Sequence, residues 1–128
     1  STGKEFLFNS DDVRVDRKVG KNIKTGQKYT KGTIPTCVWE KNNHTTSKDY
    51  CGWHVTTKNI EILDRIIRAY SNENDLVLDC FMGSGSTAIA CKLSNRDYIG
   101  SELDQVFYEK AKARIESYDR INTLSAIL

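Results

Sequence analysis

The sequence predicts an α/β fold, in which parallel strands alternate with helices, and three observations lead to that prediction. Apolar residues repeat at the helical period between residues 59 and 70. The continuous apolar run LVLDC, residues 76–80, is too short for a typical helix and suits a strand buried on both faces. A glycine turn, FMGSGS, joins that strand to a second helical segment.

The composition bounds the class of protein. The chain has 128 residues, of which 38% are hydrophobic and 28% charged, which is typical of one soluble globular domain. No apolar run approaches the roughly 20 residues of a membrane helix, and the start, STGKEFLFNS, lacks the apolar core of a signal peptide. Four cysteines are too few for a disulfide scaffold. We therefore expect a reduced, cytoplasmic protein without a membrane partner.

Positive charge is concentrated near the amino end, although the net charge is only +2. Residues 1–50 are polar and irregular. Between residues 14 and 31 a single acid, Asp16, accompanies seven basic residues: Arg14, Arg17, Lys18, Lys21, Lys24, Lys28 and Lys31. Such a cluster indicates either a surface for nucleic acid or a solvated arm.

The first predicted helix is NIEILDRIIRAY, residues 59–70. Asn59 is its expected cap, because an asparagine side chain accepts hydrogen bonds from the first free N–H groups of a helix. One face of this helix carries Ile60, Leu63, Ile67 and Tyr70, with Ile62 and Ile66 alongside. The polar run SNEND then ends it.

The elements after the glycine turn complete a βαβ unit. STAIACKLS, residues 86–94, is predicted as a short helix, and DYIGSEL, residues 97–103, as a second strand ending at Glu102. Residues 104–118 form an amphipathic helix with Asp104 as its cap. The final INTLSAIL is a further strand or a linker. We expect the crossover between the strands to be right-handed.

The glycine turn has the context of a nucleotide-binding site. Gly83-x-Gly85-x-x-Ala88 follows a strand and opens a helix, and Glu102 stands seventeen residues beyond Gly85. Glycines permit close approach of the backbone, and their N–H groups favour an electronegative ligand group. Glu102 can accept hydrogen bonds from both ribose hydroxyls, each contributing about 1.5–3 kcal/mol. The alternative is a tight turn in an ordinary α/β protein.

Asp79 narrows the choice of nucleotide. It directly precedes the turn, where a carboxylate would repel a pyrophosphate but suit an ammonium or sulfonium group. S-adenosylmethionine carries both cations. Asp79 therefore argues against a nicotinamide dinucleotide.

At this level of detail the chain resembles a known family. VLDCFMGSGSTAIACKLSNRDYIGSELDQVFYEKAKARI is similar to the cofactor half of the prokaryotic amino-DNA methyltransferases, which modify adenine N6 or cytosine N4. The family pattern reads VLDPFMGSGTT, then R-x-(F/Y)-I-G-x-E, then A-x-x-R-I. Upstream, HVTTKN resembles the HPTQKP segment of the permuted class, and IPTCVWE resembles the P-x-x-V-W stretch that closes the target-recognition region. The departures are Cys80 and Val55 for prolines, Thr57 for glutamine, and Asn59 for the last proline.

The resemblance implies a partial Rossmann-like methyltransferase fold with an incomplete sheet, S-adenosylmethionine as cofactor and double-stranded DNA as partner. It implies that residues 1–50 are the end of a target-recognition region, whose basic residues contact phosphates, and that residues 51–128 are the cofactor-binding segment. The residues implied around the methionine part are Asp79, Phe81, Gly83, Ser84, Gly85 and Ser86. Glu102 would hold the ribose and Leu103 border the adenine, with His54, Thr57 and Lys58 on the other side. Alternatively, Phe81 is core, Lys58 is a solvated charge, and His54 braces the loop.

The catalytic motif of these enzymes, (D/N/S)PP(Y/W), cannot be present, because Pro35 is the only proline. In the permuted class that motif precedes the target-recognition region, so this chain resembles a carboxyl-terminal part. No catalytic residue is assigned, and the chain alone should not methylate DNA. We expect the missing strands and catalytic loop to come from a second polypeptide, a missing amino-terminal half or a homo-oligomer, because an incomplete sheet leaves an edge and one face open. The alternatives are a non-catalytic remnant that binds DNA or a partner and, less consistent with Asp79, a nicotinamide-dependent oxidoreductase.

Two other groups of residues carry weaker signals. Cys37, His44, Cys51 and His54 match no common zinc-finger spacing, so no metal site is predicted. Cys80 and Cys91 are expected to be packed. Trp39, Tyr50 and Trp53 either anchor loops or stack on bases.

Overall fold

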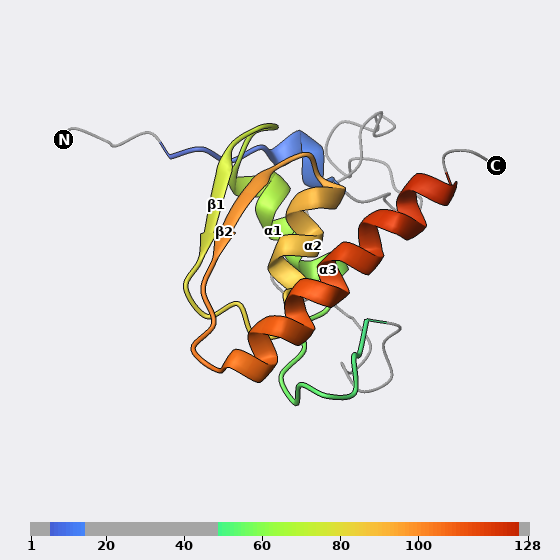
Figure 1. The fold of residues 1–128 in the computed structure, drawn as a ribbon. Helices are drawn as coiled ribbons and strands as arrows, with labels where there is room; N and C mark the ends of the chain where they lie inside the picture. The colour runs from blue at the N-terminus through green and yellow to red at the C-terminus, as the bar shows by residue number, and fades with distance from the viewer. Residues whose placement is uncertain (1–5, 15–48, 126–128) are drawn as a thin grey trace, which may run out of the picture.

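The structure is a computed structural model that describes residues 6–14 and 49–125. Figure 1 shows the order of its elements. A short 3₁₀ helix, η1 (Ser10–Val13), precedes α1 (Ile60–Tyr70), β1 (Leu76–Asp79), α2 (Ser86–Leu93), β2 (Asp97–Gly100) and α3 (Gln105–Ser125). This order confirms the predicted α/β class.

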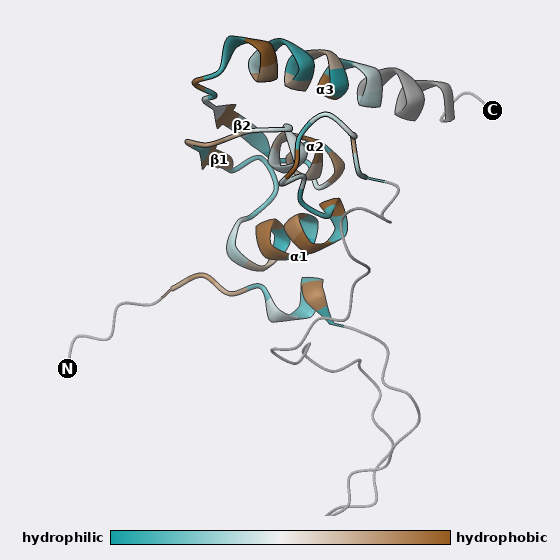
Figure 2. Ribbon diagram, turned by 90° about the horizontal axis from the view of Figure 1, so that it is seen from below, coloured by the Kyte–Doolittle hydropathy of each residue, from teal (hydrophilic) through white to brown (hydrophobic). Residues whose placement is uncertain are grey.

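The sheet of the described residues contains two parallel strands, as predicted. Leu76 pairs with Asp97 and Asp79 pairs with Gly100, so both strands run toward the same edge of the sheet. The helices α1, α2 and α3 all lie on one side of this sheet, in both views of the molecule (Figures 1 and 2). The carboxyl ends of β1 and β2 therefore lie side by side, followed by the glycine turn and by Glu102.

The other face of the sheet is open in the described part of the chain. Leu76, Leu78 and Ile99 point to it and are 61%, 67% and 55% exposed. The expectation of a strand buried on both faces is therefore wrong for β1, whereas the expectation that an incomplete sheet leaves one face open is confirmed. Cys80, expected to be packed, is exposed, because β1 ends at Asp79 and none of the described helices covers this side.

The core lies between the sheet and the helices. Ile60 and Ile67 of α1 pack against Ile89 of α2 and Ile115 of α3, and Val77 and Tyr98 close the cluster from the sheet. Cys91 is fully buried in this core, as expected, and its burial raises the pKa of the thiol to about 11. Cys91 therefore stays protonated and serves in packing.

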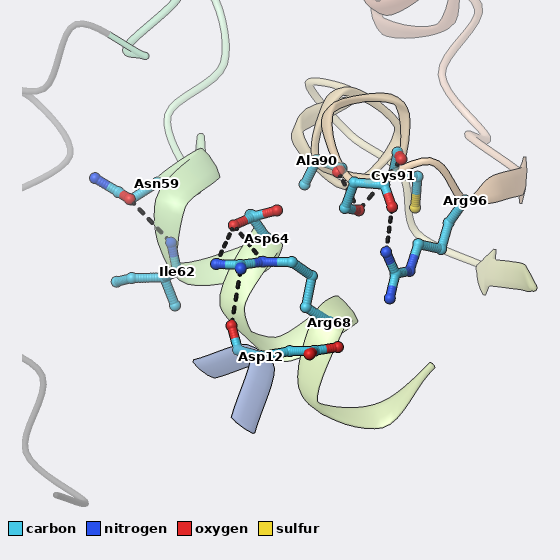
Figure 3. Close-up of polar contacts among 9 residues, drawn as sticks. Asp12, Asn59, Ile62, Asp64, Arg68, Ala90, Cys91 and Arg96 are labelled. Atoms are coloured by element: carbon cyan, nitrogen blue, oxygen red, sulfur yellow. Dashed lines mark hydrogen bonds and ion pairs between the residues drawn. The ribbon is translucent and has the colours of Figure 1, made fainter. Parts of the chain in front are cut away.

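Side-chain caps fix where the helices begin. The Oδ1 atom of Asn59 accepts a hydrogen bond from the Ile62 N–H at 3.1 Å (Figure 3). The Oδ1 atom of Asp104 accepts from the N–H groups of Val106 and Phe107, at 2.8 and 2.9 Å. Both predicted caps are thus confirmed.

The end of α3 differs from the prediction. This helix continues to Ser125, so residues 121–125 of the final INTLSAIL are helical instead of forming a strand or a linker. Neither glycine nor proline interrupts the chain between residues 104 and 125, so nothing local stops the helix. None of the helices in the described residues is long and apolar enough to cross a membrane.

The described amino-terminal residues pack on the far end of α1. The side-chain N–H₂ of Asn9 donates to the carbonyls of Ser71 and Arg68, at 2.8 and 3.2 Å. Arg68 in turn donates to the Asp12 carbonyl at 2.8 Å, and it also pairs with Asp64 (Figure 3). These contacts join segments that lie more than fifty residues apart in the sequence.

Candidate cofactor-binding site

The glycine turn between β1 and α2 requires glycine at two positions. Gly83 and Gly85 have φ angles of +51° and +76°, in the left-handed region that other residues adopt at a cost of about 1–2 kcal/mol. Neighbouring side chains also lie close. A Cβ atom on Gly83 would lie 2.8 Å from the His54 ring, and one on Gly85 would lie 3.0 Å from the Ile115 side chain.

Glu102 holds this turn from the end of β2. One carboxylate oxygen accepts the Gly83 N–H at 2.8 Å, and the other accepts the Asp104 N–H at 3.0 Å. The Gly85 N–H donates to the Met82 carbonyl at 2.9 Å. Both glycine N–H groups thus donate to protein acceptors in this structure. A carboxylate has about four acceptor positions, so Glu102 retains capacity for further hydrogen bonds.

Asp79 and Glu102 place two carboxylates at the ends of adjacent strands. Asp79 is half-buried, and its Oδ1 atom accepts the Phe81 N–H at 3.0 Å. Phe81 and Leu103 follow these strands and are almost fully exposed, at 91% and 101%. Phe81 is therefore not a core residue of this chain. The site consists of acidic groups flanked by two exposed apolar side chains, an arrangement that favours a cationic ligand with an apolar ring.

The side chains of Ser84 and Ser86 face α3. Both residues are buried, and their hydroxyl oxygens lie 3.2 Å apart. Arg114 of α3 donates to the Ser84 carbonyl at 2.8 Å and to the Ser86 hydroxyl at 3.1 Å. A ligand contact from these serines would accordingly come from their backbone. The sequence interpretation gave Arg114 no role, although an arginine within the apolar stripe of a helix is the signal that marks it.

The segment with His54, Thr57 and Lys58 lies on the other side of the turn. The buried Thr57 hydroxyl donates to the His54 carbonyl at 2.8 Å, which closes a local turn. The His54 ring lies against Gly83 and meets the Phe107 ring edge-on, with 5.0 Å between centroids. Lys58 is exposed and donates to the Thr56 carbonyl at 2.7 Å. The structure thus gives His54 a bracing contact.

Trp53 anchors this segment to α3. Its ring lies 6.1 Å from the Phe107 ring, and the Lys110 ammonium lies 5.7 Å from the Trp53 ring centroid.

Trp39 lies outside the described residues, as does most of the predicted DNA-binding stretch: Arg17, Lys18, Lys21, Lys24, Lys28 and Lys31. Arg14 is described, and its Nε–H donates to Asp11 at 2.5 Å.

Of the four residues weighed as zinc ligands, Cys51 and His54 are described, whereas Cys37 and His44 lie outside the described residues. Within the described ranges, no three histidine, cysteine, aspartate or glutamate residues gather closely enough to hold a metal ion.

Comparison with known proteins adds independent findings. Residues 1–113 match the DNA methylase family N6_N4_Mtase. The chain is 37% identical over 115 residues to the type II methyltransferase M.HpaI of Haemophilus parainfluenzae, a match that covers 89% of this chain and 35% of M.HpaI. It is 31% identical over 120 residues to the DNA adenine methyltransferase YhdJ of Escherichia coli (strain K12), covering 88% of this chain and 41% of YhdJ.

Among solved structures, the complex of M1.HpyAVI with SAM matches 45% of this chain and 31% of that protein, with 41% sequence identity and a TM-score of 0.43. In each of these three comparisons the chain spans less than half the length of the protein that it matches.

Proposed function

Because this chain belongs to the DNA methylase family, we propose that its residues 51–128 bind S-adenosylmethionine for methyl transfer to an exocyclic amino group in double-stranded DNA. One observation carries the proposal: Asp79 ends β1, Glu102 follows the adjacent parallel strand β2, and the glycine turn beside them has its own N–H groups already bonded. Such a site lacks free glycine donors for a diphosphate and offers carboxylates to a cation.

The cofactor's parts match the chemistry of this site. The Asp79 carboxylate attracts the ammonium and sulfonium groups of the methionine part. Glu102 accepts hydrogen bonds from the ribose hydroxyls with its remaining lone pairs. The exposed Phe81 and Leu103 side chains border the nucleoside. His54, Thr57 and Lys58 form the other wall, together with the backbone of Gly83–Ser86. S-adenosylmethionine supplies the methyl group when bound, and this chain's part is to bind and orient it.

The target is an amino group of adenine, or of cytosine. The adenine specificity in the name of YhdJ, a relative over 88% of this chain, favours adenine N6. The basic residues between Arg14 and Lys31 would contact DNA phosphates, which gives salt-dependent affinity rather than choice of sequence. Residues 1–50 would then be the end of a target-recognition region, and the reaction would take place in the cytoplasm.

We infer that a further polypeptide, or the preceding half of a longer chain, completes the enzyme. The open sheet face formed by Leu76, Leu78 and Ile99 is apolar, and an exposed apolar face of this kind favours a protein partner. The chain spans 35% of M.HpaI, and it holds no Pro-Pro pair for the catalytic motif. The complementary part would supply that motif and cover the open face.

Complementation tests this function. The 128-residue chain is mixed with a polypeptide that carries the (D/N/S)PP(Y/W) motif, such as the amino-terminal remainder of M.HpaI, and transfer of tritiated methyl groups to DNA is measured. We expect no transfer by either part alone and transfer by the mixture. Leu78→Lys should reduce transfer at least about tenfold, because it places a charge on the sheet face that the complementary part would cover.

Ile66→Lys is the matched control, because Ile66 is also exposed but lies on α1, away from the open face. Full transfer by the chain alone would contradict the proposed division of roles. Salt-dependent DNA binding without transfer in any mixture would instead identify a non-catalytic remnant.

A further inference from the structure

One face of α3 forms the base on which the glycine turn rests. Ala111, Arg114 and Ile115 share this face through their i, i+3 and i+4 spacing. Ala111 and Ile115 are 0% and 5% exposed, and both approach the position that a Cβ atom on Gly85 would occupy. The apolar pair thus packs beneath the turn, and Arg114 stands beside it.

The Arg114 guanidinium uses its two terminal nitrogens on two different segments. Nη1 donates to the Ser84 carbonyl at 2.8 Å and to the Ser86 hydroxyl at 3.1 Å. Nη2 donates to the Asp49 carbonyl at 2.9 Å, across 65 residues of sequence. A planar group with fixed donor directions can hold both segments at once, which a lysine ammonium does not reproduce.

Asp49 connects this contact to the opposite wall of the site. The residue is 8% exposed, and its carboxylate accepts the Ile60 N–H at 3.1 Å, at the first residue of α1. The eight residues between Asp49 and Lys58 include His54 and Thr57. Arg114 therefore fastens one end of this segment, while Asn59 and Ile60 fasten the other end through the cap of α1.

We propose that Arg114 is a positioning residue that sets the distance between the glycine turn and the segment of residues 51–58, and so shapes the site for S-adenosylmethionine. This inference rests on the proposed function. Arg114 acts through the Ser84 and Asp49 carbonyls and does not itself touch the cofactor. Without its hydrogen bonds, both walls gain freedom that the bound cofactor must remove, so binding weakens.

The test compares Arg114→Lys and Arg114→Ala with the unchanged chain, with Lys112→Met as a control on an exposed position of the same helix. Calorimetry measures S-adenosylhomocysteine binding, and mass spectrometry measures amide hydrogen exchange. We expect Arg114→Lys to bind at least about tenfold more weakly. Exchange should rise in peptides covering residues 51–58 and 83–86, and it should stay unchanged in β1.

The outcomes separate this inference from the proposed function. Failure of the unchanged chain to bind S-adenosylhomocysteine counts against the proposed function, whereas altered exchange at the two segments would still support the role of Arg114 in placing them. Binding and exchange of Arg114→Lys equal to those of the unchanged chain would overturn the inference. If Arg114→Ala does not fold, Arg114→Lys decides, because it keeps the charge and most of the aliphatic stem.

Discussion

The turn at Gly83 depends on two separate physical conditions. Its φ angle of +51° lies in the left-handed region, and the His54 ring occupies the space where a Cβ atom would stand. Gly52 has a similar φ angle of +74°, but nothing lies within 4 Å of its Cβ position. Comparing the two glycines therefore separates the cost of the left-handed backbone from the cost of a steric clash at the Cβ position.

We predict that Gly83→Ala lowers the free energy of unfolding more than Gly52→Ala does. Both variants lose about 1–2 kcal/mol through the left-handed conformation, and Gly83→Ala adds the contact with His54. In a His54→Ala background the extra loss should disappear. Urea unfolding of Gly83→Ala, Gly52→Ala, His54→Ala and the double variant Gly83→Ala/His54→Ala measures these differences. Equal losses at Gly83 and Gly52 would contradict the close approach of His54.

At the scale of single residues, the sequence indicated which residues lie at the glycine turn, but not the hydrogen bonds between them. The residue types of the turn and the acid at Glu102 predicted a nucleotide site, and both helix caps were found from local chemistry. The hydrogen bond from Gly83 to Glu102 and the role of Arg114 were missed. They join residues 19 and 30 positions apart, whose approach follows from tertiary packing and not from local pattern.

Among the elements, Arg96 ties the end of α1 to the start of β2. Arg96 is buried, with 6% of its surface exposed. It donates to the Ser71 hydroxyl and carbonyl, at 3.2 and 2.8 Å, and to the Ser94 carbonyl. The loss of a buried charged donor leaves these acceptors without their partner.

We predict that Arg96→Met lowers the free energy of unfolding by about 2–4 kcal/mol, whereas Lys112→Met on the exposed face of α3 changes it by less than about 0.5 kcal/mol. Urea denaturation followed by circular dichroism measures both. A loss below about 1 kcal/mol for Arg96→Met would show that the guanidinium contributes little to joining α1 and β2.

The helices were predictable to within a few residues because their period and caps are local signals. The extension of α3 to Ser125 was missed, since the apolar period weakens after Tyr118 while the helix simply continues. The burial of β1 was also misjudged. Leu76 and Leu78 have the composition of a strand covered on both faces, but burial depends on which elements lie above the sheet.

At the scale of the whole molecule, the helices of the described residues cover one side of a two-stranded sheet, and the other side exposes apolar residues. The incomplete sheet was predictable for two reasons. The sequence shows two clear strand patterns, and it resembles the cofactor half of a family whose catalytic motif it does not contain. The residues of this face do not identify the proposed partner, because an apolar face specifies a partner's chemistry but not its identity.

The two carboxylates, Asp79 and Glu102, should select S-adenosylmethionine as the ligand, and calorimetric titration of the 128-residue chain tests this directly. We predict that S-adenosylmethionine binds with one molecule per chain, that Glu102→Ala weakens this binding at least about tenfold, and that NADH does not bind. Binding of NADH, or no heat of binding with S-adenosylmethionine, would contradict this ligand assignment.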